Sequence, residues 1–201
     1  MKIYGDERSG NCYKLQLACA LLDVSYDWVH MDILTGDTRT EEFLALNANG
    51  KIPLLELDDG RTLAESNAIL NFLARGSHLL PDDDYVLAQV QQWQFFEQYS
   101  HEPYIAVARF IAVYQGMPEE RQQEFEDKQA GGRKALQVMD RQLLDTTYLV
   151  GDTLTTADIS LYAYTHVAHE GGFDLEPYPA VRAWLERVAK EPGYIPMGSG
   201  Q

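Results

Sequence analysis

Residues 51–66, which read KIPLLELDDGRTLAES, decide the fold of this chain. The apolar run after Pro53 predicts a short strand, because it is bounded by a proline on one side and a turn on the other. The turn itself, Asp58-Asp59-Gly60, is typical of a tight hairpin, so an antiparallel strand is expected to follow. A helix then opens at residues 64–66 and runs through Ala74. This order predicts a small sheet covered by helices.

The residues upstream add alternating elements. Their patterns predict a strand at 2–4, a helix at 11–22, a strand at 26–31 and a short helix at 41–46. Combined with the hairpin and its helix, residues 1–76 are expected to form one βαβαββα domain.

The residues downstream show helical patterns instead of alternating strands and helices. After a linker at 77–83, long helical patterns occupy 85–114, 119–144, 156–169 and 179–190. The sequence therefore predicts an α/β domain at 1–76 and an all-helical domain at 84–201. Thr155-Thr156-Ala157-Asp158 has the spacing of a capping box, which predicts a structural helix start at this point.

The charge composition of the chain limits which classes of binding partner are expected. The formal net charge is −15, from 16 Lys and Arg against 31 Asp and Glu in 201 residues. Such a chain repels phosphate backbones and anionic lipid, and no basic cluster stands out, so neither nucleic acid nor membrane is an expected partner. The first residues do not predict a signal peptide and no apolar run approaches ~20 residues, which favours a cytoplasmic protein. Cys12 and Cys19 lie two helical turns apart, ~10 Å, too far for a disulfide.

Residues 8–14, RSGNCYK, join the first strand to the first helix. Unpaired N–H groups and the helix dipole favour an anion at such a junction, a thiolate or a carboxylate of a ligand. Ser9 and Asn11 can each donate a hydrogen bond to it. Cys12 offers a thiol, but a cysteine within a helix is more often part of the core.

Two other segments have the chemistry to hold a peptide. In Lys51-Ile52-Pro53 the residue before proline is pushed toward extended geometry, so the Ile52 backbone can pair with an incoming peptide. At the next helix start, Ser66 and free N–H groups suit a carboxylate, and Glu65 suits an amine. Together the three segments fit a small peptide with an amine, carboxylates and a thiol.

This combination resembles the glutathione S-transferase family, over nearly the whole chain. The resemblance implies a thioredoxin-like domain that binds glutathione as co-substrate, a helical domain that supplies most of the second-substrate pocket, a homodimer, and no metal. It further implies that Pro53 is cis, that Ile52 pairs with the cysteinyl backbone, that Glu65 and Ser66 hold the γ-glutamyl end, and that Lys51 lies near the glycyl end.

The residue that activates the thiol differs among classes of this family, and the sequence leaves the choice open. Ser9 lies where a serine-class activator falls, Asn11 resembles the asparagine of nu-class enzymes, and Cys12 falls close to the beta-class cysteine. Tyr4, in the first strand, matches the tyrosine classes less well. Ser9 and Asn11 are the preferred catalytic residues, because hydrogen bonds from either would favour the thiolate.

Aromatic side chains on the helical pattern at 85–114 suggest an apolar pocket for the second substrate. Tyr104, Phe110 and Tyr114 are its candidates, and His101 and Arg109 are possible polar contacts. The expected function is conjugation of glutathione to small, largely apolar electrophiles, a detoxification reaction. A glutathione-dependent disulfide reductase of nu-class type and a non-catalytic binding module are the alternatives.

Overall fold

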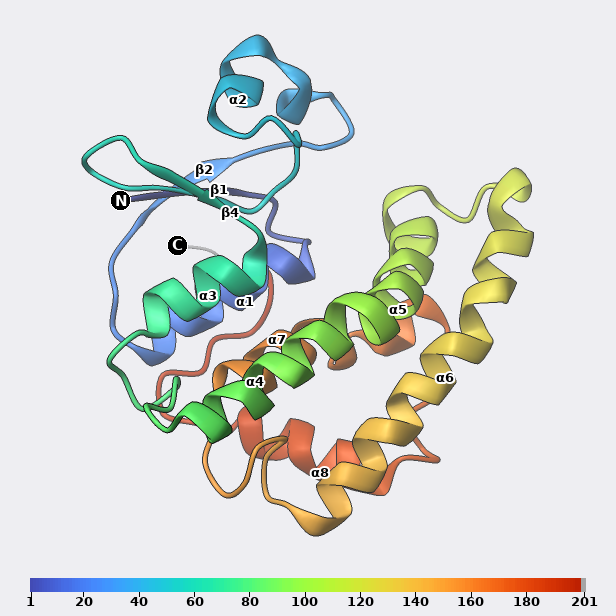
Figure 1. Ribbon diagram of the computed structural model, residues 1–201. Helices are drawn as coiled ribbons and strands as arrows, with labels where there is room; N and C mark the ends of the chain where they lie inside the picture. The colour runs from blue at the N-terminus through green and yellow to red at the C-terminus, as the bar shows by residue number, and fades with distance from the viewer. Residues whose placement is uncertain (200–201) are drawn as a thin grey trace. The chain divides into compact units, whose positions relative to one another are not determined.

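The computed structural model describes residues 1–199 and divides into two compact units (Figure 1). Met1–Ser77 and residues 191–199 form the first unit, and His78–Lys190 form the second. Each unit has its own set of packed elements. No helix among residues 1–199 is both long enough and apolar enough to cross a membrane.

The first unit is built on a mixed sheet of four strands in the order β2-β1-β3-β4. Strand β1 is parallel to β2 and antiparallel to β3, which pairs with β4 as a hairpin. The strands are β1 (Lys2–Gly5), β2 (Asp27–His30), β3 (Leu54–Glu56) and β4 (Thr62–Ala64). The hairpin is the one predicted from residues 51–66.

Helices cover both faces of this sheet (Figure 1). Tyr4, Val29 and Leu54 are register partners on neighbouring strands, so their side chains share one face. Phe43 of α2 (Glu41–Leu46) packs there, in a cluster with Leu54 at its centre. The opposite face carries Ile3 and lies toward α1 (Gly10–Leu21) and α3 (Ser66–Ala74), which pack against each other.

The end of the chain packs on the first unit, whereas the sequence analysis placed it in the helical domain. The hydroxyl of Tyr13 on α1, a fully buried residue, donates to the carbonyl of Ile195 at 2.7 Å. Gly193 lies so close to α1 that a Cβ there would stand 2.9 Å from the carbonyl oxygen of Ala20. The buried phenol needs a hydrogen-bond acceptor, and the tail supplies it.

The second unit, residues 78–190, contains helices joined by loops and no β-strand. Its α-helices are α4 (Asp84–Phe96), α5 (Glu102–Arg109), α6 (Gln122–Asp145), α7 (Thr156–Thr165) and α8 (Pro179–Val188). Wider π-helical turns, Glu97–His101 and Phe110–Tyr114, follow α4 and α5, and 3₁₀ turns occupy Glu119–Arg121 and Ala168–Gly171. The predicted helix at 85–114 is therefore continuous, but it is widened at two places.

The capping box predicted at the start of α7 is present. Thr155 caps the helix with its side chain, and Asp158 reaches back to the Thr155 N–H at 2.9 Å. The buried Asp158 carboxylate also accepts from the Leu149 N–H at 2.8 Å and from Trp184 Nε1 at 2.9 Å. Burial raises the pKa of Asp158, and these hydrogen bonds act in the opposite direction. The box thus joins α7 to α8 and to the loop before α7.

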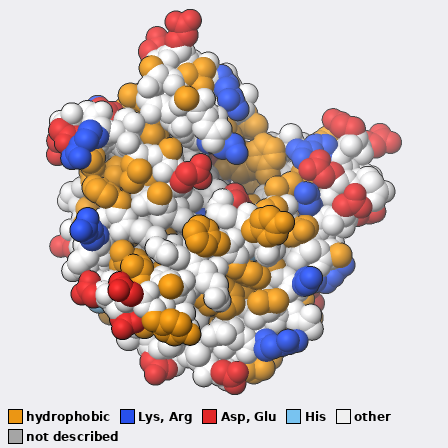
Figure 2. Space-filling model, viewed as in Figure 1, with side chains coloured by type: hydrophobic (Ala, Val, Ile, Leu, Met, Phe, Trp, Pro, Cys, Tyr) orange, Lys and Arg blue, Asp and Glu red, His pale blue; other side chains and the backbone are white. Residues whose placement is uncertain are grey.

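The surface agrees with the charge of the sequence. On the face shown in Figure 2, Lys and Arg side chains lie in small separate groups, with Asp and Glu among them. A phosphate backbone or an anionic lipid surface would need a continuous basic field there.

Candidate glutathione site

The three segments singled out in the sequence converge at one end of the sheet. Strand β1 ends there, just before the loop that carries Ser9. Leu54, the first residue of antiparallel β3, pairs with β1 near this end, so Pro53 stands at the same end. Leu54 also pairs with the last residue of β4, which brings Glu65 there as well. The hairpin register therefore places all three segments within one region of the first unit.

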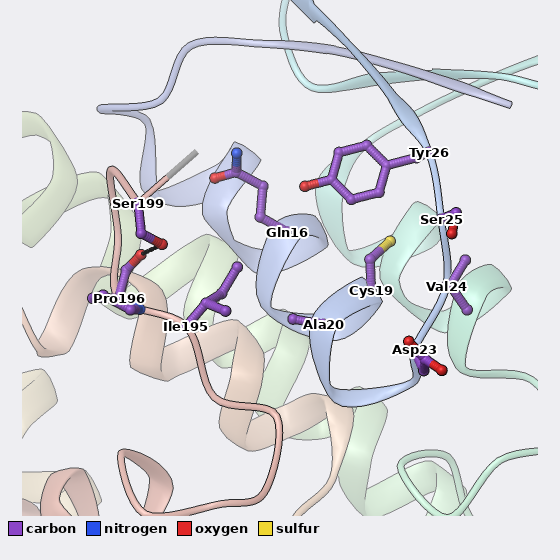
Figure 3. A pocket seen from close by; sticks show the side chains of 10 residues that line it. All are labelled: Gln16, Cys19, Ala20, Asp23, Val24, Ser25, Tyr26, Ile195, Pro196 and Ser199. Carbon is purple, nitrogen blue, oxygen red and sulfur yellow. Dashed lines mark hydrogen bonds between the residues drawn. The ribbon is translucent and has the colours of Figure 1, made fainter. Parts of the chain in front are cut away.

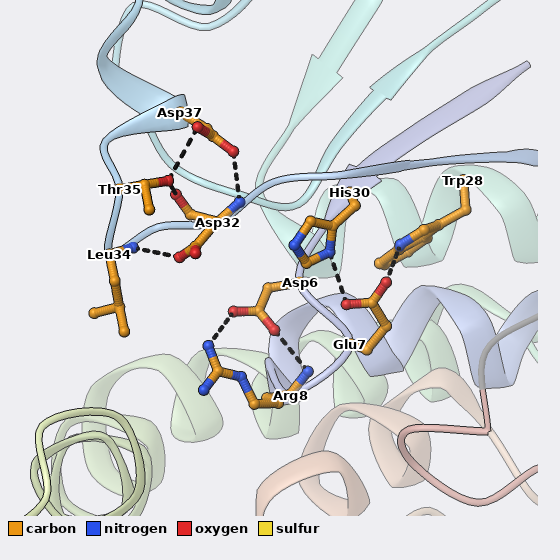
Figure 4. A network of polar contacts seen from close by, with 9 residues as sticks. All are labelled: Asp6, Glu7, Arg8, Trp28, His30, Asp32, Leu34, Thr35 and Asp37. Carbon is orange, nitrogen blue, oxygen red and sulfur yellow. Dashed lines mark hydrogen bonds and ion pairs between the residues drawn. The ribbon is translucent and has the colours of Figure 1, made fainter.

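The loop after β1 is held by charged side chains (Figure 4). The buried carboxylate of Asp6 accepts from the backbone N–H of Arg8 at 2.8 Å and from its guanidinium at 3.4 Å. Glu7 accepts from Trp28 Nε1 at 2.8 Å and lies 2.8 Å from Nδ1 of His30. Although burial alone would raise the pKa of Glu7, hydrogen bonds from its own backbone N–H, from Trp28 and from His30 lower it. The loop that leads to Ser9 is thus fixed from both sides.

Ser9 is the N-cap of α1. Its backbone is extended and its Oγ accepts from the Cys12 N–H at 3.4 Å, so one lone pair of the hydroxyl is used for the cap. Cys12 itself is fully buried, and burial raises its pKa to about 12 despite a hydrogen bond from Ser9. The expectation that Cys12 belongs to the core is confirmed. Neither Cys12 nor Cys19 is in a disulfide, as their spacing predicted.

Tyr4 is engaged away from the loop. Its hydroxyl donates to Glu56 at 2.5 Å, and its ring lies edge-on to Phe43. The hydrogen bond to Glu56, together with burial, raises the pKa of Tyr4 to about 12. A phenol committed to a carboxylate is a poor donor for a second anion, which disfavours Tyr4 as the activating residue.

The loop before β3 contains the cis peptide bond Ile52–Pro53, as the resemblance implied. Its shape depends on Asn47, a buried residue that the sequence analysis did not consider. The Asn47 side chain donates to the Lys51 carbonyl at 2.8 Å and accepts from the Asn49 N–H at 3.1 Å. Gly50 has a φ of +61°, and a Cβ there would stand 2.9 Å from a backbone oxygen, so only glycine fits.

Glu65 and Ser66 form the start of α3. Glu65 has a φ of +69° and a ψ of 113°, a backbone conformation that side-chain-bearing residues rarely adopt. Such strain is tolerated where the local structure serves a function. Glu65 is exposed, whereas Ser66 is buried at the first helical position. Backbone N–H groups at this position suit an anionic ligand group.

A chain of hydrogen bonds links α3 to α1. The hydroxyl of Ser66 donates to Oδ1 of Asn11 at 3.1 Å, and Nζ of Lys14 donates to the same hydroxyl at 3.2 Å. Asn11 is half-buried in the first turn of α1, and Lys14 is fully buried one turn later. The sequence analysis missed Lys14, because nothing in a helical pattern shows that a lysine is turned inward. Only its spacing of three residues from Asn11 was a signal.

The proposed second-substrate residues lie on α5 and the π-helical turn after it. Tyr104 is half-buried, with Nζ of Lys128 5.9 Å from its ring centre. Its ring packs over Gly131 of α6, where a Cβ would stand 2.2 Å from it. Phe110 and Tyr114 stack on each other at 5.1 Å between ring centres. The aromatic surface is therefore present on one segment of the second unit.

His101 and Arg109 are interior residues. Nε2 of His101 lies 2.9 Å from the Thr165 hydroxyl, and both residues are fully buried. Nε of Arg109 donates to Glu170 at 2.6 Å, and only 5% of Arg109 is exposed. Their contacts stabilise the helical unit, which argues against a role at the substrate.

A cavity lies elsewhere in the first unit (Figure 3). It has a volume of about 390 Å³ and is lined by the second half of α1, by residues 23–26 and by residues 195–199. Burial raises the pKa of its cysteine, Cys19, to about 12, which makes that thiol inert. Within residues 1–199, no three His, Cys, Asp or Glu side chains gather into a group that could hold a metal ion.

Comparison with known proteins agrees with this geometry. Residues 8–75 match the family profile "Glutathione S-transferase, N-terminal domain", and residues 93–192 match "Glutathione S-transferase, C-terminal domain". The crystal structure of a glutathione S-transferase from Pseudomonas fluorescens is 61% identical, with a TM-score of 0.97 and 98% of each chain covered. That of a possible glutathione S-transferase from Rhodopseudomonas palustris is 48% identical, with a TM-score of 0.96, and covers 100% of this chain and 90% of the other.

A sequence relative from a plant extends the same result. Glutathione S-transferase 4 of Zea mays is 31% identical over 217 residues, which cover 100% of this chain and 95% of the relative. The thioredoxin-like unit and the helical unit are therefore the two parts of one known fold. This chain belongs to the glutathione S-transferase family, a family of transferase enzymes.

Proposed function

We propose that this protein binds glutathione in the first unit, holds it as a thiolate, and conjugates it to small, largely apolar electrophiles. The observation that carries the proposal is the convergence of Ser9, Pro53 and Ser66 at one end of the sheet, as fixed by the hairpin register. The N-termini of α1 and α3 lie at that end, and a helix N-terminus favours an anionic group. A tripeptide with two carboxylates and a thiol complements such a site.

Each part of glutathione has a proposed partner. The γ-glutamyl carboxylate is bound by N–H groups at the start of α3, including that of Ser66, and its ammonium pairs with Glu65. The cysteinyl backbone pairs with Ile52, in the loop that Asn47 holds. The glycyl carboxylate pairs with the exposed Lys51. The strained backbone of Glu65 supports a functional role for this residue.

Ser9 and Asn11 are the proposed catalytic residues. A free thiol has a pKa of roughly 8.5, so most of it is protonated at neutral pH. Hydrogen bonds from the Ser9 hydroxyl and the Asn11 amide, near the N-terminus of α1, favour the thiolate. Catalysis then consists of presenting this thiolate to the electrophilic carbon. The carbon–sulfur bond forms as the leaving group departs with its electron pair.

The helical unit is proposed to bind the second substrate and to form the dimer. Tyr104, Phe110 and Tyr114 provide aromatic surface for an apolar electrophile. Phe95 and Tyr99, one helical turn apart, are 70% and 85% exposed. Exposed aromatic side chains of this kind favour an interface with a second copy of the chain. A homodimer in the cytoplasm that detoxifies electrophiles is the resulting proposal.

The test is binding to immobilised glutathione, followed by two assays of the same preparation. We expect retention on the resin and conjugation of a chloro-nitroaromatic substrate that exceeds disulfide reduction. Predominant reduction would favour the glutathione-dependent disulfide reductase instead. Because both protein thiols are buried, two glutathione molecules would supply the electrons. The first thiolate would attack the substrate disulfide and release one thiol, and the second would attack the resulting mixed disulfide, which releases the other thiol and oxidised glutathione. A chain that binds glutathione but catalyses neither reaction would be a binding module.

A matched pair of variants tests the glutathione contacts specifically. Lys51→Ala is expected to raise the KM for glutathione several-fold with little change in kcat, because it removes uniform binding of a carboxylate. Lys134→Ala removes an exposed charge from the helical unit and serves as the control. Equal KM values for the two variants would contradict the proposed role of Lys51.

A further inference from the structure

Lys14 is a buried lysine whose side chain reaches the proposed site. Its side chain is fully buried, among the largest fully buried side chains of the protein. A fully buried lysine has given up its contact with water, so the hydrogen bonds that its ammonium group donates to neighbouring side chains matter for the local structure. Its Nζ donates to Oγ of Ser66 at 3.2 Å, on the helix that faces α1.

The chemistry of lysine fixes the direction of this hydrogen-bond chain. An ammonium group has three N–H donors and no acceptor, so Ser66 must accept from Lys14 with a lone pair. The single proton of the Ser66 hydroxyl is then given to the other neighbour, Oδ1 of Asn11, at 3.1 Å. A hydroxyl with no lysine beside it could equally accept from the amide nitrogen of Asn11.

The direction of the chain decides which end of Asn11 is used by Ser66. With Oδ1 bound to the Ser66 hydroxyl, the N–H groups on Nδ2 form the other branch of the amide. The opposite arrangement would turn the carbonyl oxygen toward any ligand on that branch. A carbonyl oxygen repels a thiolate, whereas amide N–H groups stabilise it.

We propose that Lys14 is a positioning residue of the thiol site, which acts through Ser66 to make Asn11 present its amide N–H groups to the sulfur of glutathione. The inference deepens the proposed function and rests on it. In this proposal Ser66 has two roles. Its hydroxyl orients Asn11, and its backbone N–H binds the γ-glutamyl carboxylate. The positive charge of Lys14 beneath the site adds to the preference for an anion.

Ultraviolet titration of the thiolate of bound glutathione tests the chain link by link. Lys14→Met keeps the length and removes the charge and donors, and Ser66→Ala removes the link. Each variant is expected to raise the pKa of the glutathione thiol by about one pH unit, which is a tenfold loss of acidity. Ser66→Thr keeps the hydroxyl and should raise this pKa less than Ser66→Ala does.

A double variant of Lys14 and Asn11 distinguishes a positioning role of Lys14 from a general effect of its loss on the protein. In Asn11→Ala, adding Lys14→Met should change the pKa of the thiol much less than it does in wild type, because its target is gone. Gln16→Met is the control, since Gln16 is a buried polar residue of the same helix that faces a cavity away from the proposed site. If Lys14→Met fails to fold, Ser66→Ala is sufficient to test the proposal.

The possible results are distinct. If wild type does not bind glutathione, or binds it without lowering the pKa of its thiol, the proposed function fails and this inference fails with it. If wild type lowers that pKa and Ser66→Ala leaves it lowered, only the inference is overturned. Weaker binding of glutathione with an unchanged thiol pKa in both Lys14→Met and Ser66→Ala would likewise overturn it, because the pair would then serve only the carboxylate.

Discussion

The hydroxyl of Ser66 donates to Oδ1 of Asn11 across 3.1 Å, and this one hydrogen bond joins the first turns of α3 and α1. Sequence reasoning treated the two residues as parts of separate signals, one for a carboxylate and one for a thiolate. Their direct contact means that the proposed carboxylate site and the proposed thiol site are one polar network. A substitution of either residue should therefore alter the hydrogen bonding of the other.

The first prediction concerns the two proposed donors. Asn11→Ala and Ser9→Ala each remove a hydrogen bond to a charged sulfur, so the more important donor should lower kcat/KM at least ~10-fold when replaced. Steady-state conjugation rates measured for both variants decide between them. The Ser9 variant should in addition lose some stability, about 1 kcal/mol, because Ser9 caps α1. If both variants keep nearly full activity, the assignment of the catalytic residues is wrong.

The second prediction concerns Tyr4. Because its hydroxyl is committed to Glu56, Tyr4→Phe should leave the conjugation rate close to that of wild type. A large loss of activity would instead make Tyr4 the activating residue.

The same variant makes a prediction about pH. The hydrogen bond from Tyr4 holds the pKa of Glu56 below its ordinary value of 4.5. A carboxyl with a lowered pKa stabilises the folded protein above that ordinary value and ceases to do so as the pH falls through the lowered one. The difference in free energy of unfolding between wild type and Tyr4→Phe should therefore be present at neutral pH and shrink in acid. Urea titrations at both pH values measure it, and a difference that grows in acid would contradict the account.

The third prediction concerns the cysteines. Cys12 and Cys19 are buried and each has its pKa raised to about 12, so a thiol reagent should not label the folded protein at neutral pH. Both thiols should react after unfolding. Cys12→Ala should keep glutathione conjugation, at a cost in stability from the cavity it leaves. Rapid labelling of native protein at Cys12, or loss of activity in Cys12→Ala, would instead indicate that Cys12 is a catalytic residue.

The fourth prediction tests the role of Tyr104. In Gly131→Ala the new methyl group would stand 2.2 Å from the Tyr104 ring, so the ring has to move. We expect a higher KM for the electrophile with an unchanged pKa of the glutathione thiol, since the two effects belong to different units. Lys134→Ala, which removes an exposed side chain from the same helix, α6, is the control. An unchanged KM in Gly131→Ala would remove Tyr104 from the second-substrate surface.

The fifth prediction concerns the homodimer. Charges at two exposed aromatic positions on one helical face, in Phe95→Glu/Tyr99→Glu, should convert the dimer to a monomer. Leu34→Glu, at a 54% exposed position of the first unit, is the control. Light scattering after gel filtration measures the mass of each. A monomeric wild type, or a double variant that remains dimeric, would rule out this face as the interface.

Much of the fold could be predicted because its signals are local. The hairpin at residues 51–66 and the cap at Thr155 depend on residues close in sequence, and the structure contains both. The cis peptide bond at Pro53 followed from the family resemblance. Burial of Cys12 was also expected, from the ordinary behaviour of cysteine in a helix.

The parts that could not be predicted depend on contacts between distant segments. The inward turn of Lys14 is only meaningful beside Ser66, which lies 52 positions later. The tail was assigned to the helical domain because nothing near Ile195 shows that Tyr13, 182 positions earlier, requires its carbonyl. Asn47 escaped notice because an asparagine that holds a loop has the same local sequence as one that is merely exposed.

The most direct test of the whole account is the pKa of the glutathione thiol bound to the wild-type protein, measured from thiolate absorbance as the pH is varied. We predict a value at least about one unit below that of free glutathione, so that much of the bound peptide is thiolate at neutral pH. Glutathione that binds with the pKa of its thiol unchanged would contradict activation by Ser9 and Asn11, and an absence of binding would contradict the proposed site itself.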